Sequence, residues 1–342
     1  MRGFRTVGVV AAALVSAVVL TLGGTPVAAN ACGCGGLLPL PETTVSSSNE
    51  KALIWWDGET QTIELTFDVT SDAATAGLLI PTPGPAELSA GDLRTFALAE
   101  ATIHPTVTIQ DDWWGLDHVT PDPERIERDV IETVDLAAFQ PQTIPASDTA
   151  AVAAWLAAGG YVVSEDLQGA LNTYANYGWS FTAIRLDAQA AIDGHIPPVR
   201  LTFKTSNLVY PMRLARYEAA PQQVRLYVFD EHRNDVVQSG SPTLGIDGRT
   251  DLLYSGEVQD TRLRAMGPYL TAYDVVYDDP ENDITSDIGF YESLNDNDYL
   301  PRATEYRTIS LLGVPVGTLI VGWLLVGAIV AFAHFRGRRR AR

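Results

Sequence analysis

The sequence predicts a β-rich α+β fold, with antiparallel sheets, a central group of helices and one C-terminal transmembrane helix. Three observations predict it: short apolar runs on both sides of the middle of the chain, two helix-like stretches between residues 148 and 174, and a long uncharged run near the C-terminus. Strand patterns repeat every two residues and helix patterns every 3.6. Clustered helices beside several strands favour an antiparallel sheet that the helices cover.

The first part of the chain carries strand patterns. Residues 52–56 form an apolar run, and residues 62–69 place four apolar side chains on one face. A third run, 77–80, stops at a proline-rich stretch, because proline has no N–H for the ladder. We expect a short helix over 92–101 and a return to strand over 105–110.

Helices are expected in the middle of the chain. One short helix is expected at 124–133, and a second over 148–158, with Ser147 as its cap and two glycines at its end. A third begins at Ser164 and carries four apolar residues on one stripe. Strands are then expected over 179–186, 199–205, 208–214 and 224–229. The acidic, poorly periodic residues 277–299 are expected to form a loop-rich stalk or closing segment.

Both ends of the chain predict export and anchoring. Residues 1–31 have two arginines, an apolar centre and small residues, as in a signal peptide cleaved after Ala29 or Ala31. An uncleaved anchor is the alternative. Residues 306–335 are the expected transmembrane helix, and their uncharged part is long enough to cross a hydrocarbon core of about 30 Å. Arginines in the tail 336–342 predict a cytoplasmic C-terminus, which places residues 32–305 outside the cell membrane.

The expected extracytoplasmic domain is strongly acidic. The chain has 42 acidic and 23 basic residues, a net charge of −19, and every acidic residue lies between the two apolar ends. Such a charge disfavours nucleic acid and favours cationic partners, although solubility alone also accounts for it. The expected partners are the membrane, through the helix, and an extracytoplasmic protein or envelope polymer. The domain is long enough for two lobes, with a break near 141–147.

Cys32 and Cys34 are the two cysteines of the chain, and both lie at the expected mature N-terminus. In an oxidising compartment a disulfide between them is expected, and Gly33 permits the bend. Lipidation of Cys32 is the alternative. Two cysteines exclude a four-cysteine zinc site.

No catalytic residue can be assigned from the sequence. The stretch GWSFT at 178–182 lacks the second glycine of a serine-hydrolase elbow, and the histidines do not form the paired motif of zinc proteases. These findings favour a non-catalytic binding or structural module at the cell surface. The alternative is an envelope hydrolase that uses paired carboxylates, since pairing in space cannot be read from the sequence.

The acidic segment near the C-terminus is a weak candidate for a calcium site, and no other cofactor is expected. Calcium prefers oxygen ligands, but the spacing here does not match the usual calcium-binding loop. A solvated acidic linker is the alternative. The candidate ligands are Asp278, Asp279, Asp283, Asp296 and Asp298.

Two pairs of adjacent tryptophans are weak candidates for a binding surface: Trp55 with Trp56, and Trp113 with Trp114. Adjacent side chains of an extended chain point to opposite faces, so one indole of each pair is expected at the surface. Exposed indoles suit sugars or peptides, whereas packing in the core or at an edge is the alternative.

Several short motifs resemble a bacterial family of membrane-anchored proteins, the family of domain of unknown function 2330. They are ACGCGG at 31–36, EKALI at 50–54, WDG at 56–58, IPTP at 80–83, WL at 155–156 with GY at 160–161, Tyr174 with GW at 178–179, and VYPMRL at 209–214. The resemblance implies a signal, an outer domain and a terminal helix. It implies no activity and no catalytic residues.

Overall fold

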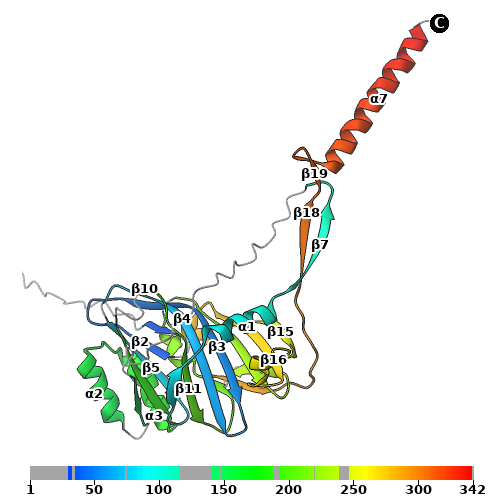
Figure 1. The fold of residues 1–342 in the computed structure, drawn as a ribbon. Coiled ribbons are helices and arrows are strands. Elements are labelled where there is room, and N and C mark those ends of the chain that lie inside the picture. Colours follow the sequence, from blue (N-terminus) through cyan, green and yellow to red (C-terminus); the bar gives the residue numbers. More distant parts are fainter. Residues whose placement is uncertain are drawn as a thin grey trace, which may run out of the picture.

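The protein consists of a body of packed sheets and a thin stalk that leads to a long C-terminal helix (Figure 1). The structure, a computed structural model, describes residues 30–32, 35–73, 75–115, 141–145, 148–187, 193–218, 220–238 and 246–340. The expected signal peptide up to residue 29, the expected helix at 124–133 and Cys34 lie outside these residues. The predicted β-rich α+β architecture, with antiparallel and mixed sheets and a C-terminal apolar helix, is confirmed.

The larger sheet forms the centre of the body. In spatial order its strands are β15 (Arg249–Glu257), β16 (Tyr269–Tyr277), β13 (Gln222–Asp230), β3 (Val45–Trp56), β4 (Thr60–Ser71), β11 (Val199–Lys204) and β6 (Glu87–Ala90), and β10 (Asp193–His195) also pairs with β4. All these pairings are antiparallel except that of β3 with β13, which is parallel. The sheet therefore joins early and late parts of the chain at its centre.

Strands β3 and β13 are apolar on both faces because each face is covered by a different core. Ala52 and Ile54 of β3 belong to the core between the sheets, whereas Leu53, between them, belongs to a second core. In β13, Val228 likewise faces the first core and Phe229 the second. Continuous apolar runs are typical of strands that are buried on both faces.

The smaller sheet packs against the larger one. Its strands, in spatial order, are β1 (Asn30–Cys32), β2 (Gly35–Leu38), β5 (Thr75–Thr82), β9 (Ser180–Asp187) and β8 (Gln142–Ile144), all antiparallel. The core between the sheets takes side chains from residues on both sides of 141–147. The pairing of β5 with β9 also crosses the break between lobes that was expected there.

Three helices of two to three turns cover the sheets: α1 (Leu93–Ile103), α2 (Thr149–Gly159) and α3 (Glu165–Asn176). Each begins at a side chain that accepts a hydrogen bond from the first turn: Asp92, Asp148 and Ser164. Asp148 therefore takes the capping role that was expected of Ser147. Helix α1 covers the second core, while α2 lies on the outer side of the smaller sheet (Figure 1).

A third, smaller sheet replaces the long strand that was expected over 208–214. It contains β12 (Val209–Tyr210), β17 (Ile288–Glu292) and β14 (Asn234–Gln238). After Pro211 the chain turns into the 3-10 helix η2 (Arg213–Tyr217), because Asp287 Oδ1 accepts the N–H groups of Met212 at 3.0 Å and Arg213 at 3.1 Å. The prediction of a strand to residue 214 was wrong because these hydrogen bonds come from a distant carboxylate.

Of the two roles expected for the acidic residues 277–299, a stalk or a closing segment, the structure shows a closing segment of the body. These residues contain the short helix α6 (Pro280–Asp283) and the paired strand β17, and they are held to the body. Ser293 donates its N–H to Arg233 O at 2.8 Å and its hydroxyl to Asp235 Oδ2 at 2.7 Å. Pairing with distant strands overrides the weak local pattern of this segment.

The stalk is built from two segments that are far apart in the sequence. Strand β7 (Thr106–Asp112) runs parallel to β18 (Arg302–Thr308) through seven paired residues. The hairpin of β19 (Ser310–Leu311) and β20 (Val314–Pro315) follows, and then helix α7 (Val316–Arg340). The transmembrane helix was expected from residue 306, but residues 302–308 pair with β7 instead.

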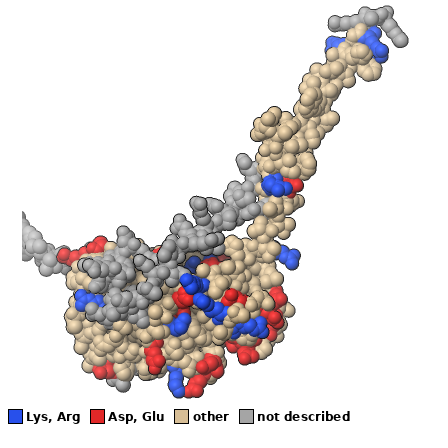
Figure 2. Space-filling view, in the orientation of Figure 1, with Lys and Arg blue, Asp and Glu red and all other residues tan. Residues whose placement is uncertain are grey.

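Helix α7 is long and apolar enough to cross a membrane. Its candidate span is Val316–Arg339. The most apolar stretch of this span has a mean hydropathy of 2.4, and only 6% of that stretch is buried in the structure. A helix so exposed is not part of the core of the body. Figure 2 shows charged side chains on the body and at the far end of this helix, and none along its visible shaft.

Glu218, which follows η2, is buried without a hydrogen-bond partner for Oε1 among the described residues. Burial raises the pKa of its carboxyl from 4.5 to about 9. Below pH 4.5 the carboxyl is neutral whether the chain is folded or unfolded, so folding has no charge to bury. As the pH rises from 4.5 toward 9, the unfolded chain loses this proton and the folded state becomes less favourable.

Glu218→Gln, a neutral side chain of similar shape, is therefore predicted to stabilise the protein increasingly as the pH rises from 5 to 8. The gain in the free energy of unfolding should be about 3 kcal/mol near pH 7 and below about 1 kcal/mol at pH 5. Denaturant unfolding of the full chain in detergent measures it. Exposed Glu281→Gln is the matched control, and an equal gain for Glu218→Gln at both pH values would contradict the prediction.

Candidate functional site

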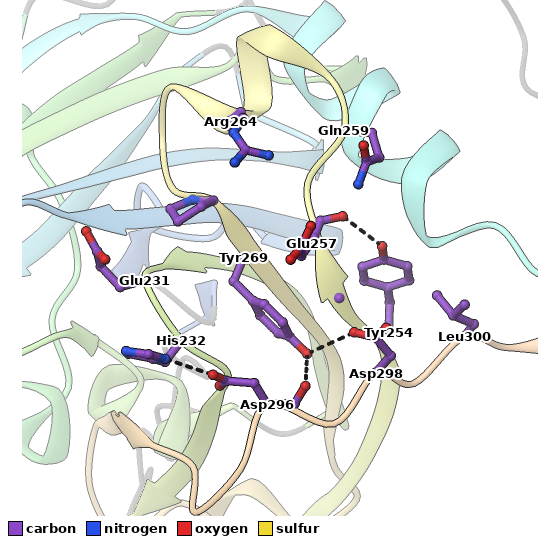
Figure 3. A pocket seen from close by; sticks show the side chains of 12 residues that line it. Glu231, His232, Tyr254, Glu257, Gln259, Arg264, Tyr269, Asp296, Asp298 and Leu300 are labelled. Atoms are coloured by element: carbon purple, nitrogen blue, oxygen red, sulfur yellow. Dashed lines mark hydrogen bonds and ion pairs between the residues drawn. The ribbon is translucent and has the colours of Figure 1, made fainter.

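A pocket of about 590 Å³ opens where the body meets the stalk. Figure 3 shows its walls, which come from the turn after β13, the end of β15, the start of β16 and the segment before β18. Four of the residues that line it carry carboxylates, and two are tyrosines. The lining residues are Glu231, His232, Tyr254, Gly256, Glu257, Gln259, Arg264, Pro268, Tyr269, Asp296, Asp298 and Leu300.

The connection between β15 and β16 forms one wall. Asp260 starts the short helix α5 (Thr261–Arg264) by accepting the N–H groups of Arg262 at 2.8 Å and Leu263 at 3.1 Å. Leu263 is fully buried and holds this connection against the second core. At Gly267 a Cβ atom would lie 2.6 Å from Asp230 N, so only glycine allows the backbone to approach the neighbouring turn so closely.

The segment 293–300 forms the opposite wall and is fixed to the edge of the sheet. Ser255 and Tyr299 exchange backbone hydrogen bonds at 2.9 and 2.8 Å. Ser255 Oγ also donates to Asn297 O at 2.8 Å, and the Tyr269 hydroxyl donates to Asp296 O at 3.2 Å. The wall that carries Asp298 is therefore held by both backbone and side-chain contacts.

A hydrogen-bonded pair of opposite charges, His232 and Asp296, lies at one side of the pocket. His232 Nδ1 lies 2.8 Å from Asp296 Oδ2, while Asp296 Oδ1 accepts the N–H of Arg233 at 2.9 Å. The hydrogen bond from His232 lowers the pKa of Asp296, and the carboxylate in turn raises the pKa of His232. Both side chains are about half exposed, so the pair orients the wall more than it stabilises the fold.

The remaining charges of the pocket are mostly negative. Glu231, Glu257 and Asp298 carry exposed carboxylates, while the guanidinium of Arg264 donates to Val258 O at 3.1 Å. Burial raises the pKa of Tyr254 and Tyr269, so their hydroxyls remain protonated at neutral pH. Such a site suits a cationic group, which carboxylates attract and phenol hydroxyls or rings contact.

The candidate calcium ligands fall into two separate groups. Asp278, Asp279 and Asp283 lie at α6, before β17, whereas Asp296 and Asp298 lie beyond its other end. Strand β17, whose five residues span about 16 Å, lies between the two groups along the chain. Among the described residues no three acidic, histidine or cysteine side chains are placed to hold one metal ion. Calcium binding stays a prediction of the sequence alone.

The tryptophan candidates lie at three different places. Trp55 is half-buried, and the guanidinium of Arg200 lies 5.6 Å from the centre of its ring. Trp56 packs against the core between the sheets. Trp113 and Trp114 are about half exposed, at the base of α7. None of the four lines the pocket.

The expected disulfide cannot be followed in the structure. Cys32 is the last residue of β1, and Cys34 lies outside the described residues. Their pairing stays a prediction.

Most residues of the pocket were missed by the sequence reasoning, apart from Asp296 and Asp298, which were proposed as metal ligands. Strands β15 and β16 were not predicted, so Tyr254, Glu257 and Tyr269 had no place in the expected fold. One signal was available: Asp260 stands immediately before a short helical turn, as a cap does. His232 belongs to the histidines that do not form the paired motif of zinc proteases, so the sequence did not single it out.

Comparison with known families assigns the chain to one of them. The model of the family described as "Uncharacterized protein conserved in bacteria (DUF2330)" matches residues 28–291. The chain belongs to this family. The DUF2330 match includes the walls of the pocket from Glu231 to Tyr269 but ends before Asp296, the strand β18 and the helix α7.

Two of the motifs that resemble DUF2330 carry tyrosines that donate to carboxylates away from the pocket. The hydroxyl of Tyr174 donates to Asp287, and the hydroxyl of Tyr210 donates to buried Glu50. Asp287 also caps the first residues of η2. These contacts therefore connect α3 with the start of η2, and β12 with β3.

No curated protein matches the chain. Among solved structures, the crystal structure of baculovirus P35 is 9% identical, with a TM-score of 0.33 over 77% of this chain and 98% of that one. A mutated baculovirus P35 after caspase cleavage is 10% identical, with a TM-score of 0.31 over 74% and 98%. Likeness at this level carries no conclusion about fold or function.

Asp296→Asn is predicted to return the pKa of His232 toward its ordinary value, because the partner carboxylate raises it. Below its raised pKa the His232 ring is protonated and forms a charged pair with the Asp296 carboxylate. As the pH rises through that pKa, the ring loses its proton and the charged pair is lost. NMR titration of the His232 ring measures the shift. Asp298→Asn, which removes a carboxylate that does not contact His232, is the control. Equal effects of the two substitutions would refute the pairing.

Proposed function

We propose that the protein is a non-catalytic, membrane-anchored surface module that binds a cationic group in the acidic pocket. The observation that carries this proposal is the gathering of Glu231, Glu257, Asp296 and Asp298 around one pocket at the foot of the stalk. These residues come from three separate parts of the chain. A surface charge that served solubility alone would not require them to converge.

The proposed anchor is helix α7, in the cell membrane. Its length and apolar surface support a single crossing, and the arginines that follow support a cytoplasmic C-terminus. With this orientation the body lies outside the cytoplasm, in agreement with the signal sequence expected at residues 1–31.

The proposed ligand is an amine or guanidinium group of an extracytoplasmic protein or envelope polymer. A pocket of about 590 Å³ accepts a long cationic side chain. Asp298 Oδ1 lies 3.5 Å from the Tyr269 hydroxyl. Asp296, on the same wall, is held by its hydrogen bonds with His232 and with the N–H of Arg233. Carboxylates that are held in place before binding lose little side-chain entropy when the ligand arrives.

An envelope hydrolase with paired carboxylates has less support. Such an enzyme needs one carboxyl that stays protonated near neutral pH. Glu64 and Glu218 are the described acids with a raised pKa, and neither lines the pocket. Glu64 is paired with Arg200 at 2.7 Å, and His232 lowers the pKa of Asp296. The acids of the pocket therefore suit binding better than proton donation.

The proposed topology predicts that protease added to intact spheroplasts digests the body and leaves a fragment that contains α7. The reason is that the basic tail holds the C-terminus on the cytoplasmic side. Immunoblotting with a C-terminal epitope measures the fragment, and a cytoplasmic protein serves as the control for lysis. Protection of the whole chain in spheroplasts that remain sealed would refute the orientation.

The proposed site predicts that the full chain in detergent binds tetralysine more tightly than tetralysine with acetylated side chains. Glu257→Gln and Asp298→Asn should each weaken binding about two- to five-fold, the effect of one exposed charge pair. Calorimetric titration at low ionic strength measures the affinity, which should fall as salt is added.

Glu281→Gln is the matched control for this titration. Glu281 is exposed in α6 and does not line the pocket, yet its substitution changes the net charge as much as Glu257→Gln does. Equal losses for all three variants would indicate a general charge effect and contradict a site at the pocket. Equal affinity for the two peptides would contradict cation binding altogether.

A further inference from the structure

The base of α7 is held by a part of the chain about 200 residues earlier. The N–H of Gly317, in the first turn of α7, donates to Trp113 O at 2.7 Å, and the N–H of Ile309 donates to Asp112 O at 2.9 Å. A Cβ atom at Gly317 would lie 2.7 Å from Cε3 of Trp114, so this indole packs directly on the helix backbone. The end of β7 is therefore fixed against the start of the helix.

Beside these tryptophans lies an exposed apolar hairpin. Leu311 is 60% exposed and Leu312 96% exposed, at the turn between β19 and β20. Leu312 has a φ of 55°, a region in which apolar side chains are uncommon and asparagine or glycine is usual. Two leucines at the tip of a turn in water would leave much apolar surface unburied. Burial in lipid would remove it from water.

The length of the helix places this region at one surface of a bilayer. Residues 316–335 carry no Asp, Glu, Lys or Arg, and 20 helical residues span about 30 Å, the thickness of a hydrocarbon core. The arginines that begin at Arg336 then lie at one face of the bilayer. The first turn of α7, with Trp113 and Trp114, lies at the other.

Charged groups resume just below the tryptophans. Arg307 of β18 and Asp111 of β7 form an exposed ion pair with an N–O distance of 2.8 Å. Between Arg307 and Arg336 the sequence has no residue that is fully charged at neutral pH. The surface thus changes from charged to apolar between this ion pair and the helix. Trp113 and Trp114 lie at this change, and indoles favour the interface between membrane and water.

We propose that Trp113, Trp114 and the hairpin of residues 310–315, together called the seat, insert into the headgroup layer of the outer leaflet. This inference rests on the proposed anchoring by α7 and adds a second contact with lipid. The partner is the bilayer that surrounds the helix, because the seat is continuous with the first turn of that helix. The indoles supply amphipathic rings and the two leucines supply apolar surface.

The seat has a consequence for the pocket. Because β7 and β18 both reach it, the body is connected to the membrane by two hydrogen-bonded strands and not by one flexible chain. Seven strand residues span about 23 Å, and Leu300 of the pocket stands two residues before β18. The pocket is thereby held at a set height above the bilayer.

Fluorescence of the full chain in vesicles tests this proposal. Trp323→Phe removes the indole within the span and serves as the background variant. A second variant adds Trp113→Phe and Trp114→Phe to this background. The fluorescence of the first variant minus that of the second is the signal of the seat. Lipids brominated near the headgroup should quench this signal more than lipids brominated deep in the acyl chains. The signal of Trp55 and Trp56, obtained in the same way, should be quenched by neither.

Flotation separates failure of the seat from failure of the anchor. If the protein floats with the vesicles but shallow bromines leave the signal of Trp113 and Trp114 unchanged, the seat is refuted and the anchor stands. Stronger quenching by deep bromines would also refute a position in the headgroup layer. Failure to float would overturn the anchor, and the seat with it.

Gly317→Ala tests how the seat is held. The added Cβ would press on Trp113 O and on the Trp114 ring, so the emission of these tryptophans should shift and their quenching by shallow bromines should fall. Gly322→Ala is the matched control, because nothing lies within 4 Å of a Cβ at that position. Identical spectra for the two variants would contradict the contact.

Discussion

The parallel pairing of β3 with β13 is the constraint on which the rest of the body depends. It brings residues 50–55 beside residues 224–229, at the centre of a sheet that is buried on both faces. Burial of a large apolar side chain contributes about 1.5–3 kcal/mol, and alternate residues of these two strands contribute to both cores. The neighbouring strands of the larger sheet take their places from this pair, because β16 pairs with β13 and β4 pairs with β3.

The position of the pocket follows from the same sheet. Strand β16 pairs with β13, β15 pairs with β16, and their connection therefore meets the turn after β13 at one end of the body. The segment 293–300 crosses that end and continues into β18. Acidic residues that are up to 67 positions apart, from Glu231 to Asp298, thus line one pocket, and the strand that follows this segment leads to helix α7.

Local patterns were sufficient where a segment is regular. The apolar runs at 52–56 and 224–229 predicted strands, and Ser164 predicted the start of α3, because alternation and capping are properties of neighbouring residues. The pattern failed at 208–214, where Asp287 turns the chain, and at 306–308, where pairing with β7 replaces the start of the expected helix. In both cases the deciding partner is distant in the sequence.

The sequence by itself determined the fold class, the family motifs, the acidic charge and the apolar C-terminal helix. Each of these depends on composition or on short-range periodicity. Only the tertiary structure decided that Trp113 and Trp114 lie at the base of α7, and that His232 and Asp296 share one pocket wall. These neighbours are brought together by strand pairing between distant segments. The register of such pairing depends on the burial of whole faces, which no local pattern contains.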